Sequence, residues 1–469
     1  MNTRLFKVAG IAFSILWAAQ SPLFAGPPAP DSGVSVNIKG VTIDLGGFIE
    51  AAGIYRSTNS NSDIASKFQS LPLSNSPGYY QDQALFSARQ SRLSLLAKAD
   101  FDQETHLAGY YEMDFLGAAP TANSNECNSY NLRIRHLYTT IDWDNLGLHL
   151  LGGQTWSLAT MNSEGIVPGK VLSPMTIDAQ YVVGFTWTRQ PGFRIVKDFD
   201  RMLWLGVSVE NPQTTIASQP KAITAVNDAN SQAAGSNFAS TNTMSANSVP
   251  DFVGKVAFDP GWGHFEVYDL ARNFQSNLVN STKTSIGDTS IETNAAGAGI
   301  LLPIVPKVLT LMASGLIGSG IGRYGSGQLS DAVQDQQGID IPLNGSQLLT
   351  GLTFTPVPEA TVYAYYGQEQ INRQAWTGTN DSGYGYGVSI APANNSGTAT
   401  IGGTVNGNIS KISEITVGTW LKCYEGKAGE IRLGLQYAHA EDLYYSVADG
   451  GTPAAYQNQF YVSLRYYWK

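Results

Sequence analysis

Apolar and polar residues alternate with a period of two along much of the chain. In residues 430–439, one face is apolar and is formed by Ile431, Leu433, Leu435 and Tyr437. The other face is polar and contains Arg432 and Gln436. Because successive side chains of a β-strand point to opposite faces, this pattern predicts strands with one apolar and one polar face. A soluble β-sandwich and a membrane barrel both show it, so alternation alone leaves the fold open.

About sixteen segments of this kind can be delimited along the chain. They are 41–55, 85–100, 105–116, 131–142, 147–157, 180–197, 202–211, 251–259, 263–274, 293–306, 308–323, 346–356, 360–371, 411–424, 430–443 and 456–468. Two of them are interrupted by turn-forming residues, because 180–197 contains Pro191 and Gly192 and 293–306 contains two prolines. The last segment alternates up to Trp468, which is typical of the final strand of an outer-membrane protein.

The links between these segments alternate in length, and this alternation decides the fold. The short links are rich in Gly, Pro, Asp and Asn, the residues of tight turns. They are Asp100–Glu104, Asp142–Leu146, Asp198–Arg201, Asp259–Gly263, Pro356–Glu359 and Glu425–Gly429. The links between them are long and rich in Ser, Asn, Thr and Gly. The sequence therefore predicts an all-β fold, a closed antiparallel transmembrane β-barrel of about sixteen strands with short periplasmic turns, long extracellular loops and periplasmic termini.

The N-terminus has the features of an export signal. Arg4 and Lys7 precede the apolar stretch 8–19, and Ala25 supplies a small residue for cleavage. We expect residues 1–25 to be a signal peptide, 26–40 a Pro-rich periplasmic segment and 41–469 the barrel. A short apolar stretch could also anchor a protein in a membrane, but this one is shorter than the ~20 residues of a spanning helix. The expected location is the bacterial outer membrane.

Composition and motifs narrow the possible functions. Charged residues make up 14% of the chain, below the ~25% of an ordinary soluble domain, and the net charge is -9. No basic block stands out, which argues against a nucleic-acid partner. The chain has no Gly-x-Ser-x-Gly sequence, and its five histidines lack the spacing of a metal site. We therefore expect neither an enzyme nor a cofactor.

Several short motifs resemble those of the DcaP-like family of trimeric outer-membrane porins. In chain order they are Ala88-Arg89-Gln90-Ser91-Arg92-Leu93, Leu132-Arg133-Ile134-Arg135-His136, Gly153-Gln154-Thr155-Trp156-Ser157, Arg189-Gln190-Pro191, Val209-Glu210-Asn211-Pro212, Trp262-Gly263-His264, Arg272-Asn273, Gly320-Ile321-Gly322-Arg323-Tyr324 and Gly434-Leu435-Gln436-Tyr437. The resemblance implies a homotrimer that passes small hydrophilic, preferably anionic, solutes. The chain departs from members with an N-terminal coiled coil, because residues 26–40 contain no heptads.

Strand parity assigns charged side chains to the lumen, where charge sets the selectivity of a channel. Arg92, Arg133 and Arg135 project from the second and fourth segments, and Glu112 and Asp114 from the third segment between them. Later segments contribute further lumen charges, namely Lys255, Arg272 and Arg432, opposed by Glu210, Glu266 and Glu414. An arginine here could attract anions or could pair with a carboxylate to brace the wall, and parity does not distinguish the two.

The loop 158–179, after the fifth segment, is a candidate constriction. Glu164, Lys170 and Asp178 are its charged residues, and Pro168 and Pro174 suit a compact irregular loop. The alternative is an ordinary exposed loop. Together with the resemblance, these features predict passive diffusion of small hydrophilic solutes with a mild preference for anions such as carboxylates. A structural or adhesive barrel, or an outer-membrane hydrolase, is the alternative function, and outer-membrane lipid is an expected partner.

The two cysteines test the predicted topology. Cys127 falls in the long loop after the third segment, and Cys423 ends the fourteenth segment beside a short turn. The two residues would therefore lie at opposite rims, which are separated by the ~25 Å apolar band of a barrel. A disulfide requires Cα atoms within about 7 Å, so we expect none between them.

Overall fold

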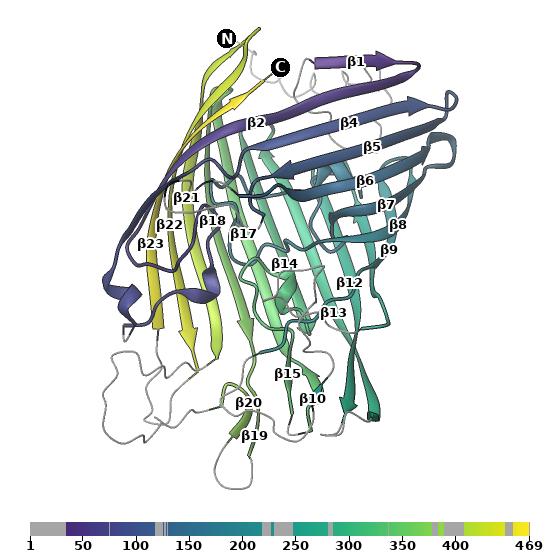
Figure 1. The fold of residues 1–469 in the computed structure, drawn as a ribbon. Helices are drawn as coiled ribbons and strands as arrows, with labels where there is room; N and C mark the ends of the chain where they lie inside the picture. Colours follow the sequence, from purple (N-terminus) through teal and green to yellow (C-terminus); the bar gives the residue numbers. More distant parts are fainter. Residues whose placement is uncertain are drawn as a thin grey trace, which may run out of the picture.

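The computed structural model describes residues 34–74, 76–117, 125, 128, 130–217, 227–228, 247–279, 285–335, 337–377, 383–388, 408–445 and 454–468. Its architecture is a closed antiparallel β-barrel (Figure 1). The main sheet contains nineteen strands, of which β1 and β10 are short additions, while β3 and β4 are two parts of one wall strand. The wall therefore has sixteen strands, and the predicted fold class is confirmed.

The wall strands follow one another around the barrel in chain order. Their bounds are β2 (Val41–Arg56), β3 (Gln83–Ser87), β4 (Arg92–Asp100), β5 (Thr105–Asp114), β6 (Arg133–Trp143), β7 (Leu148–Trp156), β8 (Arg189–Phe199), β9 (Leu203–Glu210), β11 (Asp251–Phe258), β12 (His264–Val279), β13 (Ser285–Val305), β14 (Leu309–Ser319), β17 (Asn344–Val357), β18 (Ala360–Ile371), β21 (Ile409–Gly426), β22 (Gly429–Tyr444) and β23 (Ala454–Tyr467). The smaller strands are β1 (Val34–Ile38), β10 (Asn227–Asp228), β15 (Ala332–Gln334), β16 (Asp340–Pro342), β19 (Gln374–Thr377) and β20 (Gly383–Tyr386).

The barrel closes where the last strand pairs with the first. β23 pairs with β2 from Phe48↔Tyr467 to Arg56↔Gln459. The start of β2 and the end of β23 therefore lie at the same end of the barrel (Figure 1). The short turns lie at this end too, since every second link is a turn. None of the helices in the described part of the chain has the length and hydropathy of a membrane-spanning helix.

The wall is apolar outside and polar inside, the reverse of a soluble protein. On β23, the outward side chains Phe460, Val462 and Leu464 are exposed, whereas inward Gln459 and Ser463 are fully buried. Lipid is the solvent for such an outer surface, and closure of the barrel pairs most backbone groups of the wall, which lipid could not satisfy. The chain is therefore an outer-membrane β-barrel protein.

Several strands differ from the predicted bounds. β13 begins at Ser285 and not at residue 293, and β14 ends at Ser319 and not at residue 323. The alternation at 180–197 predicts a strand from residue 180, but β8 begins at Arg189. Residues 180–188 are almost all buried in the barrel interior and do not belong to the wall. The second wall strand is split, since residues 88–91 leave the sheet between β3 and β4 and turn inward. Cys423 is exposed on β21, and Cys127 lies outside the described residues.

Three loops enter the barrel and fill much of its interior. We call them the first, second and third inserted segments, residues 57–82, 157–188 and 320–343. Each contributes fully buried apolar side chains, for example Phe68, Ile177 and Tyr324. The segments also bond to one another, with Ala179 N donating to Ile64 O (3.1 Å) and Trp187 N donating to Tyr324 O (2.9 Å). The interior is thus a packed core beside a charged surface, and not a uniformly open lumen.

Candidate functional site

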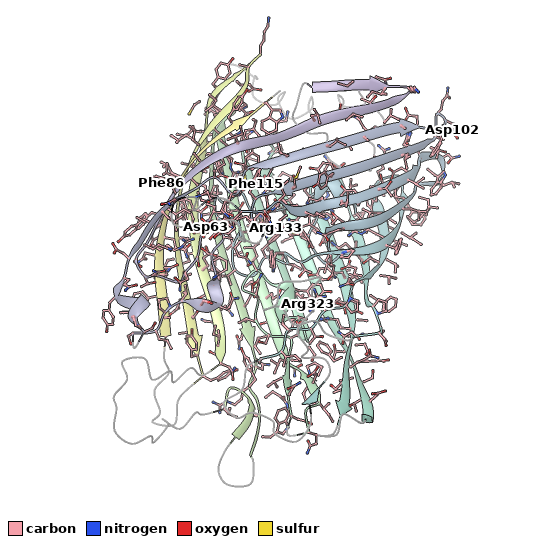
Figure 2. The ribbon with its side chains drawn as sticks, in the orientation of Figure 1. Asp63, Phe86, Asp102, Phe115, Arg133 and Arg323 are labelled. Carbon is pink, nitrogen blue, oxygen red and sulfur yellow. The ribbon has the colours of Figure 1, made fainter. Side chains whose placement is uncertain are left out.

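A ladder of arginines and carboxylates lies on the inner wall where β4, β5 and β6 are adjacent. Arg133 Nη2 lies 2.7 Å from Asp114 Oδ2, and Arg135 Nη1 lies 3.0 Å from the same atom. Arg135 Nε also reaches Glu112 Oε1 at 2.6 Å, and Arg92 Nη1 lies 3.7 Å from it. The structure therefore brings these five residues together. Arg133, which is 33% exposed in its side chain, lies near mid-height of the barrel (Figure 2).

A β-bulge in β6 sharpens this arrangement. The register of β5 and β6 shifts between Glu112↔His136 and Met113↔Ile134, which leaves Arg135 as the extra residue. As a result Arg135 and His136 are consecutive in the chain but are both buried toward the interior. Bulges commonly re-aim side chains at functional positions. Strict alternation of side chains does not predict a bulge. Parity in the sequence therefore does not place His136 inside the barrel.

Arg189, at the start of β8, is an inward cation that the parity analysis missed. It is partly exposed, and its guanidinium lies 4.8 Å from the ring centroid of Trp156. Within the described residues it makes no ion pair, and its Nη1 atom has no hydrogen-bond partner. Arg133 and Arg135 lie within electrostatic range of it. We call Arg92, Arg133, Arg135, Arg189, Glu112 and Asp114 the arginine cluster.

Tyr181 connects the arginine cluster to the second inserted segment. Its hydroxyl oxygen accepts a hydrogen bond from Arg135 Nη2 at 3.0 Å, and its backbone adopts a left-handed φ of 69°. Burial alone would raise the pKa of Tyr181, but the positive charges of Arg135, Arg92 and Arg189 outweigh it and lower the pKa to about 8. The phenol therefore titrates closer to neutral pH than an ordinary tyrosine.

Wall carboxylates hold the start of the second inserted segment. Glu210 on β9 accepts a hydrogen bond from Leu158 N at 2.8 Å, and Glu266 on β12 accepts one from Asn162 N at 3.0 Å. Lys255 is fully buried, lies 2.9 Å from Glu266 and donates to Thr160 O at 2.8 Å. These charges, which parity correctly places inside, therefore contact the segment backbone and not open solvent.

The candidate charges of the loop 158–179 occupy two different environments. Lys170 Nζ pairs with Glu164 Oε2 at 3.2 Å, and both side chains are more than two-fifths exposed. Asp178 is fully buried, where it accepts hydrogen bonds from Ser66 N, Gln180 N and the hydroxyl of Tyr461. Burial raises the pKa of Asp178 despite these donors. Asp178 therefore joins two inserted segments.

Arg272 and Arg432, the remaining arginines that parity assigned to the lumen, are also paired. Arg272 on β12 is 2% exposed and lies 3.2 Å from Asp251 and 3.0 Å from Asp331. Arg323, labelled in Figure 2, approaches the same two aspartates, so this network fixes the third inserted segment. Arg432 pairs with Glu430 and is 31% exposed. Within the described residues, no group of His, Cys, Asp and Glu is arranged to hold a metal ion.

The fold has counterparts among solved structures. The outer membrane channel DcaP of Acinetobacter baumannii has a TM-score of 0.64 and 18% sequence identity, covering 93% of this chain and 100% of the channel. OmpT of Vibrio cholerae (TM-score 0.49, 10% identity) and OmpF of Salmonella typhi (0.48, 11%) each cover 93% of this chain and match over 100% of their own. No protein-family model and no curated protein matches the chain.

The likeness to DcaP decides the type of barrel. This is the fold of an outer-membrane porin. The similarity agrees with the fold implied by the resemblance of the sequence motifs. At 18% identity it shows the fold alone, and function must be argued from the site itself.

Proposed function

We propose that this porin is a passive diffusion channel for small hydrophilic solutes with a mild preference for anions, carboxylates among them. The observation that carries the proposal is the composition of the arginine cluster. It contains four arginines and two carboxylates, and Arg189 has no carboxylate partner in the described chain. A surplus of fixed positive charge lowers the barrier for anions, and arginine can bind a carboxylate through two parallel hydrogen bonds.

The members of the cluster would contribute unequally. Arg133 and Arg92 have side-chain exposures of 33% and 20%, so passing solutes could touch them. Arg135 is 2% exposed and already pairs with both carboxylates, so its main contribution would be to brace the wall. The two alternatives that parity left open thus apply to different residues. The second inserted segment, which includes the loop 158–179, would form the constriction and restrict the channel to small solutes.

Planar-bilayer recording of the purified protein tests this proposal. Under a salt gradient, the zero-current potential should have the sign expected for a channel more permeable to chloride than to potassium. The preference for anions should decline as the salt concentration rises, because salt screens the fixed charge. A protein that inserts but does not conduct would instead favour the structural or adhesive barrel, and cation preference would refute the role of the cluster.

Recording at different pH values tests the contribution of Tyr181 to the ion preference. With its pKa lowered to about 8, Tyr181 is neutral near pH 6 and becomes negative as pH rises through 8. Each phenolate cancels one positive charge beside Arg135, so anion preference should fall between pH 7 and pH 9. The variant Tyr181→Phe should keep its preference over this range, whereas an equal decline in both proteins would assign the effect to another group.

We also propose that the protein is a homotrimer, because the described part of the chain leaves one edge of β3 without a partner strand. Among the described residues, β3 pairs only with β2, so the other edge of Gln83–Ser87 has no strand beside it. Unpaired backbone groups are not tolerated at the hydrocarbon level of a membrane. A neighbouring copy would cover this edge. The resemblance to a trimeric family supports three copies, whose contacts would rest on the barrel walls.

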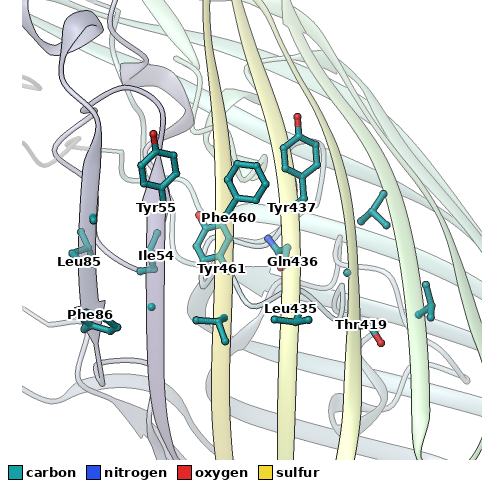
Figure 3. A pocket seen from close by; sticks show the side chains of 16 residues that line it. Ile54, Tyr55, Leu85, Phe86, Thr419, Leu435, Gln436, Tyr437, Phe460 and Tyr461 are labelled. Atoms are coloured by element: carbon teal, nitrogen blue, oxygen red, sulfur yellow. The ribbon is translucent and has the colours of Figure 1, made fainter.

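The outer surface beside this edge has the shape of a contact site. Phe86, on β3, is 83% exposed, and a groove of about 880 Å³ runs from it across β2, β23, β22 and β21 (Figure 3). The groove is apolar, with Tyr55, Phe460 and Tyr437 standing together along it (Figure 3). An exposed apolar groove beside the exposed ring of Phe86 could receive the same surface of a second copy of this chain.

Substitution of Phe86 tests the trimer. Phe86→Asp should shift the detergent-solubilised protein from trimer to monomer in analytical ultracentrifugation, because it places a charge in a closed apolar contact. Ile317→Asp is the matched control, since Ile317 is 65% exposed on β14 and outside the groove. Dissociation by both variants, or by neither, would remove this surface from the trimer contact.

The hydrolase alternative finds no support on the outer wall. His439 Nδ1 donates a 2.9 Å hydrogen bond to Asn458 Oδ1, and the His439 ring stacks on Tyr456. In the described part of the chain no serine hydroxyl hydrogen-bonds to His439. Without a nucleophile beside a base, acyl transfer has no starting point, and we propose no catalytic role.

A further inference from the structure

Two carboxylates on neighbouring strands bind the second and third inserted segments at one place. Glu369 lies on β18 and Glu414 on β21, and each is 1% exposed. Glu369 Oε1 accepts hydrogen bonds from Gly184 N and from Gly327 N, both at 2.8 Å. Glu414 Oε2 accepts one from Val183 N at 2.9 Å. The two side chains therefore bind the backbone of both segments directly.

Neither carboxylate forms an ion pair in the described chain. Glu266, which binds the start of the second inserted segment, differs in this respect. Glu266 is paired with Lys255, whereas Glu369 and Glu414 accept hydrogen bonds from backbone amides and from the hydroxyl groups of Ser326 and Thr416. A buried carboxylate without a counterion costs several kcal/mol, so such a pair is not explained by barrel stability. What the pair secures is the position of the segments.

The glycines at this place bring the segment backbone directly onto the wall. A Cβ atom on Gly184, whose φ is +83°, would collide with Leu348 O of β17, and one on Gly367 of β18 would collide with Val183 O. A Cβ on Gly325 would collide with the Glu369 carboxylate. The backbone of the inserted segments is therefore in direct contact with the wall where the carboxylates bind it, and this contact leaves the segments little room to move.

We infer that Glu369 and Glu414 are positioning residues that clamp the second and third inserted segments to the β18–β21 wall and thereby set the width of the channel. The inference rests on the proposed channel function. Val183 and Gly184 follow closely after Tyr181, whose hydroxyl is bonded to Arg135 on the opposite side of the segment. Release of the clamp would therefore loosen the segment and disturb the arginine cluster at once.

The test is the double variant Glu369→Gln plus Glu414→Gln. Glutamine keeps the side-chain shape, but each bond to a backbone N–H loses its charge and is weaker by about half. Hydrogen exchange of the amides of residues 175–185 should become at least about tenfold faster, and single-channel conductance should rise by roughly twofold with more current noise. Asp442→Asn is the matched control, because Asp442 is fully buried on β22 beside the backbone of Leu71 in the first inserted segment.

A second variant acts without touching the carboxylates. Gly184→Ala should reproduce the faster exchange and the larger conductance, because its methyl group cannot occupy the space held by Leu348 O. Folding of every variant is checked by its mobility in unheated gels. Unchanged exchange in both folded variants would overturn the clamp. Faster exchange with no current in any protein, including the unmodified one, would retain the clamp and refute the channel function.

Discussion

Replacing Arg189 by alanine should shift the selectivity of the channel toward cations more than any other single arginine substitution that leaves the barrel folded. Arg189 is partly exposed and forms no ion pair in the described chain, although Asp114 lies within electrostatic range of it, so its loss removes the least neutralised charge of the cluster. A unit charge at ~6 Å changes the energy of a passing anion by roughly 1–3 kcal/mol at effective dielectric constants between water and a protein surface. The ratio of anion to cation permeability should therefore fall about fivefold or more at low salt.

The controls for this prediction use charges that are already neutralised. Lys170→Ala removes an equal charge, but Lys170 pairs with Glu164 on an exposed part of the loop, so the zero-current potential should change little. Arg133→Ala should lie between the two, because Arg133 is exposed but shares Asp114 with Arg135. A larger shift for Lys170→Ala than for Arg189→Ala would place the selective charge in the exposed loop and not in the cluster.

The wall could be read from the sequence because the bilayer imposes a simple rule on it. Each wall strand must present apolar groups to lipid and polar groups to the interior, so period-two alternation and link length were sufficient. Arg92, Arg133, Glu112 and Asp114, which parity assigned to the lumen, form ion pairs with one another or with Arg135 where β4, β5 and β6 are adjacent. These features depend only on neighbours along the chain and on the membrane, and tertiary contacts do not change them.

The interior could not be predicted in the same way, because its packing depends on contacts between distant segments. Residues 180–188 alternate like a strand, but the partners of Val183 and Gly184 are side chains of β18 and β21, more than 180 residues away. The bulge at Arg135 and the guanidinium of Arg189, which forms no ion pair in the described chain, likewise depend on three-dimensional packing. The one available signal was composition, since the loop 158–179 contains buried apolar residues such as Ile166 and Ile177 that an exposed loop would not need.

Replacing Lys255 by alanine should destabilise the barrel strongly. The side chains of Lys255 and Glu266 are both fully buried and lie 2.9 Å apart. Loss of the ammonium leaves Glu266 with His264, whose Nε2 atom lies 3.1 Å from Glu266 Oε2, as its remaining side-chain partner. Breaking a buried ion pair by removing one partner typically costs about 3–5 kcal/mol. The substitution also removes the bond from Lys255 to Thr160 O, and with it one attachment of the second inserted segment. Guanidinium unfolding in detergent, followed by tryptophan fluorescence, measures the free energy of unfolding.

Two further variants separate the lost charge from the lost contact. Arg432→Ala breaks an ion pair whose arginine is 31% exposed, so its cost should stay below about 1 kcal/mol. The double variant Lys255→Met plus Glu266→Gln removes both charges while the amide oxygen can still accept the bond from Asn162 N. Because an apolar or neutral replacement of a buried ion pair is often close to neutral, it should recover most of the stability that Lys255→Ala loses. If the double variant is as unstable as Lys255→Ala, the lysine stabilises the barrel through its contact with Thr160 and not by neutralising Glu266.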